Sequence, residues 1–255
     1  MSIIDPGLDH PPMDPLKDAF LSALSHELRT PVTVLRGYAA TLRRIESERI
    51  ELTREQRQAM LDAMVERADQ LDRLVSDLLD FDSLSSGMLI AHRRTSELRS
   101  LILRVAEYVD VGDHPLEIDV PAALVNVDVA KVERMVESLL RNAAKYSAPG
   151  TRVRIEGRIE GAELWIVVED LGPGVPDSLK EEVYAPLQHG PARSAHSPGT
   201  GMGLALVAAF AGLHGGRAWI EDGPNGGTRS RVVLRLDDGP IPATAPQPNG
   251  IPADG

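Results

Sequence analysis

The stretch that decides the fold of the first part of the chain runs from Phe20 to Pro31 and reads FLSALSHELRTP. From here, apolar residues recur at intervals of three and four, the spacing of one face of an amphipathic helix: Leu21, Leu24, Leu28, Val32, Leu35, Ala39 and Leu42. His26 lies off that face, beside Glu27 and one turn before Thr30. Because Pro31 has no N–H, we expect the helix to bend or loosen just past His26. An outward-facing imidazole beside a carboxylate at such a point suggests a chemical role.

A lone histidine on a polar helix face is usually only solvated. None of the seven histidines shows the one-turn pair of a zinc-binding helix. The neighbours of His26 make the difference, because the run SHELRTP, residues 25–31, closely resembles the phosphoacceptor box of sensor histidine kinases. A box of this kind requires a partner that binds ATP.

A second helix with a functional face is predicted between Asp128 and Ser147. Asp128 is a good N-cap, and the apolar residues form one face: Val132, Met135, Val136, Leu139, Leu140 and Ala143. Ser138, Asn142 and Lys145 share another side, at i, i+4 and i+7. An amide oxygen suits Mg²⁺ and an ammonium suits phosphate oxygens. Taken alone, these residues would be better explained by the end of a surface helix with an ordinary Lys.

Two glycine-rich segments follow. The run LWIVVEDLGPGV, residues 164–175, predicts a buried strand that stops at Asp170, where glycines allow a ligand close to the backbone. The run PGTGMGL, residues 198–204, leads into an apolar helix whose N-terminal N–H groups could hold phosphate. It is neither a Walker loop nor a Rossmann turn. Each segment alone could be a structural turn.

In this order, the His26 box, NAAKYS, DLGPG and GTGMGL resemble the catalytic core of histidine kinases over roughly residues 15–236. The second half resembles the ATP-binding GHKL (Bergerat) fold shared with Hsp90, the gyrase B subunit and MutL. The resemblance implies ATP and Mg²⁺ as cofactors, with Asn142 ligating Mg²⁺ and with Lys145 and Tyr146 approaching the phosphates. Asp170 would accept a hydrogen bond from the adenine amino group. The other implied nucleotide-binding residues are Gly172, Gly174, Gly199, Thr200, Gly201, Met202, Gly203 and Leu204.

The same resemblance gives roles to three residues of the first box. His26 would attack the γ-phosphoryl group through one ring nitrogen, Glu27 would accept the proton on the other, and Thr30 would position water for dephosphorylating a partner. That partner would be an aspartate-bearing response regulator. The sequence departs from the family where Ser138 replaces a frequent Asn, where Tyr184 and Leu187 replace two phenylalanines, and where Ser230 or Arg231 replaces an aromatic residue. These departures bear on lid closure and on the kinase rate.

Composition bounds the remaining options. A chain of 255 residues with 42% hydrophobic content can form two domains, and the absence of cysteine excludes disulfides and thiol catalysis. The net charge of −11 argues against nucleic-acid binding. No apolar run reaches the roughly 20 residues of a membrane span, so we expect a cytoplasmic protein. No recognisable sensor domain fits into the first fourteen residues, so we expect an upstream or separate sensor.

We therefore predict a two-domain α+β protein. Residues 1–14 are a flexible linker, 15–86 a dimerisation and histidine phosphotransfer domain, 87–236 an ATP-binding α/β sandwich, and 237–255 a disordered tail. The first domain is a hairpin of helices over 15–45 and from a Thr53 cap to residue 84. The second helix has its own apolar stripe: Met60, Met64, Leu71, Val75, Leu78 and Leu79. Two hairpins would pair into the four-helix bundle of a homodimer.

Within the second domain we expect a helix near 96–109 and strands around 115–127, 151–158, 163–170, 217–222 and 228–236, with a lid at 184–199. Three alternatives remain open. The chain could be a different GHKL ATPase, which would not need the His26 box. It could be a degenerate kinase acting mainly as a phosphatase or scaffold, or a helical adaptor that binds no ATP.

Overall fold

A computed structural model describes residues 15–48, 51–184 and 201–236, with side chains from residue 21 onward. The chain divides into two compact units. The first holds the N-terminal helices up to Met88 and, of the later described residues, Gly201–Ala205; the second holds Leu89–Tyr184 and the residues from Leu206 onward, so the helix that begins at Gly203 lies mostly in the second. The predicted linker, the predicted tail and nearly all of the predicted lid lie outside the described residues, and the three boundaries between the four predicted segments stay predictions.

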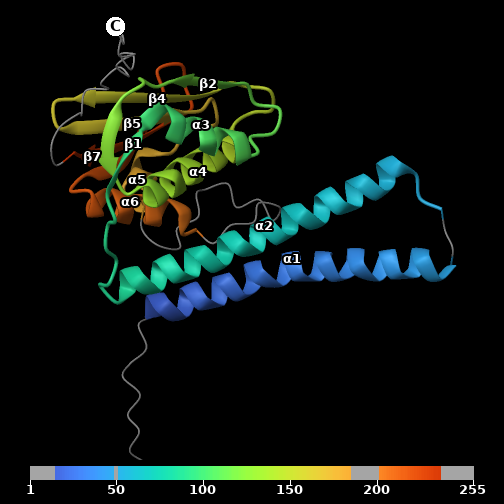
Figure 1. The fold of residues 1–255 in the computed structure, drawn as a ribbon. Helices are drawn as coiled ribbons and strands as arrows, with labels where there is room; N and C mark the ends of the chain where they lie inside the picture. The colour runs from blue at the N-terminus through green and yellow to red at the C-terminus, as the bar shows by residue number, and fades with distance from the viewer. Residues whose placement is uncertain (1–14, 49–50, 185–200, 237–255) are drawn as a thin grey trace, which may run out of the picture. The chain divides into compact units, whose positions relative to one another are not determined.

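The first unit contains a hairpin of two long helices, α1 (Pro15–Glu48) and α2 (Arg54–Ser85), which lie side by side (Figure 1). The predicted Thr53 cap is present as a capping box: the Gln56 N–H donates to Thr53 Oγ1 over 3.2 Å, and the Thr53 N–H donates to Gln56 Oε1 over 3.1 Å. Helix α1 continues through Pro31 without interruption, so the proline does not end it.

The second unit is an α/β domain. Its elements follow in chain order: β1 (Arg94–Glu97), α3 (Leu98–Tyr108), β2 (Leu116–Asp119), β3 (Leu124–Val127), α4 (Val129–Tyr146), β4 (Val153–Glu160), β5 (Glu163–Glu169), α5 (Asp177–Lys180), the 3₁₀ turn η1 (Glu182–Tyr184), α6 (Gly203–Leu213), β6 (Arg217–Asp222) and β7 (Thr228–Arg235). The sheet has the order β2-β4-β5-β7-β6, with β2 parallel to β4 and the other pairs antiparallel. Strands β1 and β3 form a separate antiparallel pair.

Helices α3, α4 and α6 lie over one face of the sheet (Figure 1), which confirms the predicted layer of helices on a mixed sheet. The core between them is closed, with Leu140 of α4, Ile155 of β4 and Leu164 of β5 all fully buried. Burial of such side chains contributes roughly 1.5–3 kcal/mol each. The sheet and its helices therefore form a rigid base for the residues at the strand and helix ends.

The structure adds three short elements that the sequence did not predict: β1, α5 and η1. Each has at most four residues, too few for a hydrophobic period to be recognised. Within the residues that the structure describes, no helix combines the length and the apolar character needed to cross a bilayer.

Candidate functional site

The last turns of α4 hold the polar residues that the sequence singled out. Asp128 caps the helix, since its side chain accepts a hydrogen bond from the Lys131 N–H over 3.1 Å. The predicted apolar face is buried in full, which turns Ser138, Asn142 and Lys145 away from the core. The half-buried Asn142 amide makes no hydrogen bond with the described residues. An amide oxygen is a ligand that Mg²⁺ accepts, so the residue type fits the predicted role.

Asp170 lies where β5 ends, and it is 8% exposed. Its Oδ1 accepts hydrogen bonds from the Gly172 N–H over 2.8 Å and from the Thr228 N–H over 3.3 Å. Burial raises the pKa of this carboxyl above its ordinary 3.8, and the hydrogen bonds from Gly172 and Thr228 offset part of the rise. Since a carboxylate offers about four lone-pair sites, Asp170 keeps acceptor capacity for a ligand amino group.

Contacts at Gly172 bring the DLGPG box against the NAAKYS box. A Cβ at Gly172 would lie 2.6 Å from the carbonyl oxygen of Tyr146, so the loop after Asp170 packs directly on the end of α4. Next to Tyr146, the Ser147 Oγ is buried without a hydrogen-bond partner among the described residues. A buried hydroxyl without a partner costs about 1–3 kcal/mol. The contact at Gly172 therefore holds the loop after Asp170 against the end of α4, next to the predicted nucleotide-binding residues Lys145 and Tyr146.

The glycine segments are only partly described. Gly174 has a φ of +76° and Gly201 a φ of +67°, so both use the left-handed backbone that other residues rarely adopt. Met202 is fully buried, and Gly203 and Leu204 begin α6. Gly199 and Thr200 lie outside the described residues, so their predicted role stays a prediction.

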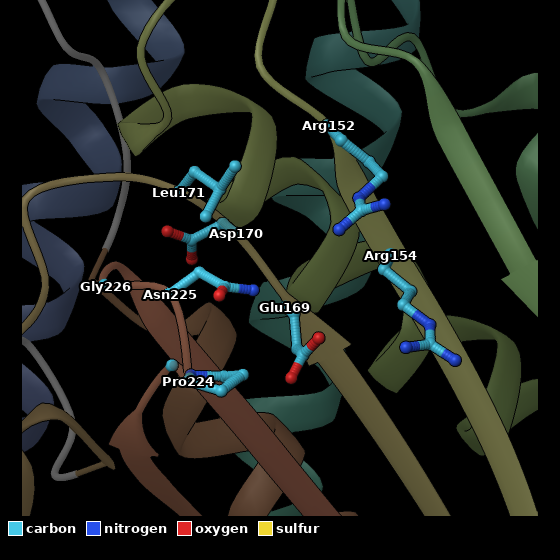
Figure 2. A pocket seen from close by; sticks show the side chains of 9 residues that line it. Arg152, Arg154, Glu169, Asp170, Leu171, Pro224, Asn225 and Gly226 are labelled. Carbon is cyan, nitrogen blue, oxygen red and sulfur yellow. The ribbon is translucent and has the colours of Figure 1, made fainter.

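A pocket that the sequence did not predict lies beside Asp170 (Figure 2). It is lined by Arg152, Arg154, Glu169, Asp170, Leu171, Gly223, Pro224, Asn225 and Gly226. Arg152 pairs with Glu117 over 3.0 Å, Arg154 with Asp119 over 2.9 Å, and Glu169 with Arg229. Because these ion pairs balance the charges, the pocket does not favour a phosphate group. The sequence did not indicate this pocket, because the charged residues at the start of β4 alternate with apolar ones as on any half-exposed strand.

In the hairpin, His26 and Thr30 are exposed and Glu27 is half-buried. Among the described residues, the imidazole has no hydrogen-bond or ion-pair partner. His26 and Glu27 are not hydrogen-bonded to each other, since consecutive side chains on a helix point in different directions. The predicted proton transfer to Glu27 therefore needs a change of side-chain rotamer.

Two of the predicted departures from the family meet in space. The Tyr184 hydroxyl is buried beside Ser230 on β7, without a well-formed hydrogen bond. Burial raises the pKa of Tyr184, and the Ser230 hydroxyl lowers it in part. The chain thus has a Tyr–Ser pair at positions where the family that it resembles usually has aromatic residues. Leu187 lies outside the described residues.

Comparisons with known proteins agree with this geometry. Residues 16–87 match the His Kinase A (phospho-acceptor) domain, and residues 127–238 match the histidine kinase-, DNA gyrase B- and HSP90-like ATPase family. The chain is 32% identical to the sensor protein KdpD of Escherichia coli strain K12, over 88% of this chain and 25% of that protein. It is 33% identical to the signal transduction histidine-protein kinase/phosphatase MprB of Mycobacterium sp. strain KMS, over 81% of this chain and 40% of that protein.

A solved structure of a mycobacterial sensor histidine kinase MprB aligns with a TM-score of 0.51 and 29% identity, over 57% of this chain and 98% of that one. The chain spans between a quarter and two fifths of the length of these two curated relatives. The first family match covers the helical hairpin and the second covers the α/β domain. This combination identifies the family of the chain. The chain belongs to the sensor histidine kinases and comprises their catalytic core, a phosphoacceptor hairpin followed by an ATPase-type domain.

Proposed function

We propose that this chain phosphorylates its own His26 with ATP and passes the phosphoryl group to an aspartate of a response regulator. The observation that carries the proposal is the exposed imidazole of His26, free of partners within the described structure, in a domain of the phosphoacceptor family. A stable fold gains nothing from an unpaired histidine at that position, whereas a nucleophile requires access.

The second unit supports the nucleotide half of the proposal. Asp170 is held by two backbone N–H groups in an orientation that leaves it able to accept from an adenine amino group. Asn142 would hold Mg²⁺ through its amide oxygen, and Lys145, whose Nζ lies 5.0 Å from the Tyr146 ring centre, would approach the phosphates. ATP, when bound with Mg²⁺, supplies an activated γ-phosphoryl group with partly neutralised charge.

The reaction at His26 follows from its chemistry. One neutral ring nitrogen forms the N–P bond while the β–γ phosphoanhydride bond breaks, and ADP leaves with the electron pair. The proton on the other ring nitrogen passes to Glu27, which turns toward the imidazole as positive charge develops there. The phosphoryl group then moves from nitrogen to a carboxylate oxygen of the regulator.

We further propose that the hairpin forms a homodimer. One face of α2 exposes Leu61, Val65, Val75 and Leu79, which are 44–63% exposed and lie on one side of the helix at about 100° per residue. On α1, Leu21 and Val32 are 39% and 42% exposed. A second hairpin would cover both stripes and form a four-helix bundle.

The kinase proposal is tested with γ-³²P-ATP and the variants His26→Gln and His92→Gln. His92 is also exposed, so the second variant controls for the loss of a surface imidazole. We expect acid-labile, base-stable label on wild type and on His92→Gln, and none on His26→Gln. Label persisting on His26→Gln would refute the assignment.

A second activity is favoured by two observations. The exposed Thr30 lies one turn after His26, and the Tyr184 hydroxyl is buried beside Ser230 at the first residue of the predicted lid. We propose that the chain also dephosphorylates its regulator, with Thr30 positioning the attacking water. Thr30→Ala should slow dephosphorylation of a phosphorylated regulator while leaving labelling of His26 within about twofold, a change of under 0.5 kcal/mol in the barrier. Binding of ATP without any labelling of wild type would favour a phosphatase or scaffold.

A further inference from the structure

A buried histidine outside the sequence boxes joins the end of α6 to the start of α4. His214 is fully buried. Its Nδ1 lies 2.7 Å from the carbonyl oxygen of Phe210, and its Nε2 lies 3.0 Å from the backbone nitrogen of Asp128. A carbonyl can only accept and an amide N–H can only donate, so the proton is on Nδ1 and the lone pair is on Nε2. The partners thus fix one neutral tautomer.

The backbone holds this ring in place. Gly215 has a φ of +66° and donates to the carbonyl of Gly212, while the Gly216 N–H donates to the carbonyl of Ala211, each over 2.9 Å. This pair of bonds is a Schellman motif, which ends α6 at Leu213 with His214 as the C-cap residue. A Cβ at Gly216 would lie only 1.7 Å from the Val233 carbonyl oxygen, so the turn is pressed against β7.

Asp128, on the other side of the bond, is itself a junction. Its backbone N–H donates to His214, its Oδ1 accepts from the Lys131 N–H to cap α4, and its Oδ2 accepts from the His92 N–H over 2.8 Å. His92 belongs to the connector, which we define as residues 89–93 at the start of the second unit. One aspartate therefore holds the connector, α4 and α6 together.

A second path closes the ring of contacts. The Arg235 N–H donates to the carbonyl of His214, and Arg93 Nη1 in the connector donates to the carbonyl of Arg235, each over 3.0 Å. The connector thus reaches His214 both through α4 and through the end of β7. His214 is therefore linked to the connector by two separate sets of hydrogen bonds.

We propose that His214 is a positioning residue for nucleotide binding, which holds α4, α6 and the connector in register through the Asp128 amide. The inference rests on the proposed function, because α4 carries Asn142 and Lys145 in its last turns and α6 begins at Gly203 in the glycine box. Fixing the distal end of each helix limits how far the ends with the nucleotide-binding residues can shift.

Two variants distinguish a positioning role of the His214 side chain from a role in which it only fills space in the core. In His214→Gln, the longer side chain can place an amide oxygen where Nε2 lies and keep the bond from the Asp128 N–H. In His214→Asn, the shorter amide can replace only the donor to Phe210 and leaves the Asp128 N–H without an acceptor. Hydrogen exchange of the Asp128 amide and the Kd for ATP are measured on the whole chain.

We expect the Asp128 amide in His214→Asn to exchange at least about tenfold faster than in wild type, and its Kd for ATP to rise about fivefold. His214→Gln should stay within about twofold on both. Wild-type values in His214→Asn, or equal impairment of both variants, would overturn the proposal. If wild type itself binds no ATP, the proposed function fails, and the exchange rates still decide whether the junction exists.

A measurement on wild type covers the case in which His214→Asn does not fold. The ¹⁵N chemical shifts of His214 should show a protonated Nδ1 and an unprotonated Nε2 that accepts a hydrogen bond. Protonation on Nε2 would place two donors face to face and would refute the junction.

Discussion

Replacing Asp170 by Asn tests the nucleotide site with almost no change of shape. In wild type, Oδ1 is held by the N–H groups of Gly172 and Thr228. Asn can keep that oxygen in place, and its Nδ2 then takes the position of Oδ2. The variant therefore presents a donor where the adenine amino group also donates.

The size of the effect follows from the charge of the bond that is lost. A hydrogen bond to a charged group contributes about 1.5–3 kcal/mol, and every 1.4 kcal/mol is tenfold in affinity. We expect the Kd of Asp170→Asn for ATP to rise by about 10- to 100-fold. Purine riboside triphosphate, which lacks the amino group, should bind wild type weakly and lose no further affinity in the variant.

Folding should respond in the opposite direction. Burial raises the pKa of Asp170, so the folded state favours the protonated form. Protonated Asp170 therefore stabilises the fold at low pH, and this stabilisation is lost as the pH rises through the raised pKa. At pH 7 the carboxylate is ionised and buried, so it destabilises the fold. Asp170→Asn should match or exceed the Tm of wild type at pH 7. Wild-type affinity for ATP should fall on acidification at a pH above the ordinary carboxyl pKa of 3.8.

The assay is isothermal titration of ATP and of the analogue into wild type and Asp170→Asn, with calorimetric Tm values as the control for folding. Equal ATP affinity of the two proteins would refute adenine recognition by Asp170. So would an equal loss for ATP and for the analogue, since the effect would then not involve the amino group.

Three further predictions concern stability and assembly. Tyr184→Phe removes a buried hydroxyl without a well-formed hydrogen bond and should raise the free energy of unfolding by about 1 kcal/mol in urea titrations; a loss would show that Ser230 pairs with it. Thr53→Ala should lower the stability of the hairpin by about 1 kcal/mol in thermal melts, whereas Thr41→Ala, inside α1, should not; equal effects would deny the capping box a special role. Leu79→Glu should yield monomers in light scattering, while Ala59→Glu, which adds the same charge outside the apolar stripe, should not; a persistent Leu79→Glu dimer would place the interface elsewhere.

Much of the fold could be predicted from local patterns. The buried face of α4 shows the three- and four-residue spacing of its apolar residues, and β6 spans the predicted residues 217–222. Strand β1 could not be predicted, because its four residues have no clear alternation and their pairing with β3 depends on residues about 30 positions away. The pocket beside Asp170 was missed for the same reason, since its lining comes from β4, the end of β5 and the turn before β7.

By itself, the sequence determined the boxes, their order and the family, because these depend on residue types at fixed short spacings. The tertiary structure alone decided which groups meet: Gly172 against the Tyr146 carbonyl, Tyr184 beside Ser230, and His214 bonded to Asp128. The physical reason is that hydrogen bonds and close contacts act over a few ångströms in space. His214 and Asp128 are 86 positions apart in the chain, and only the packing of α4 and α6 brings them within 3.0 Å.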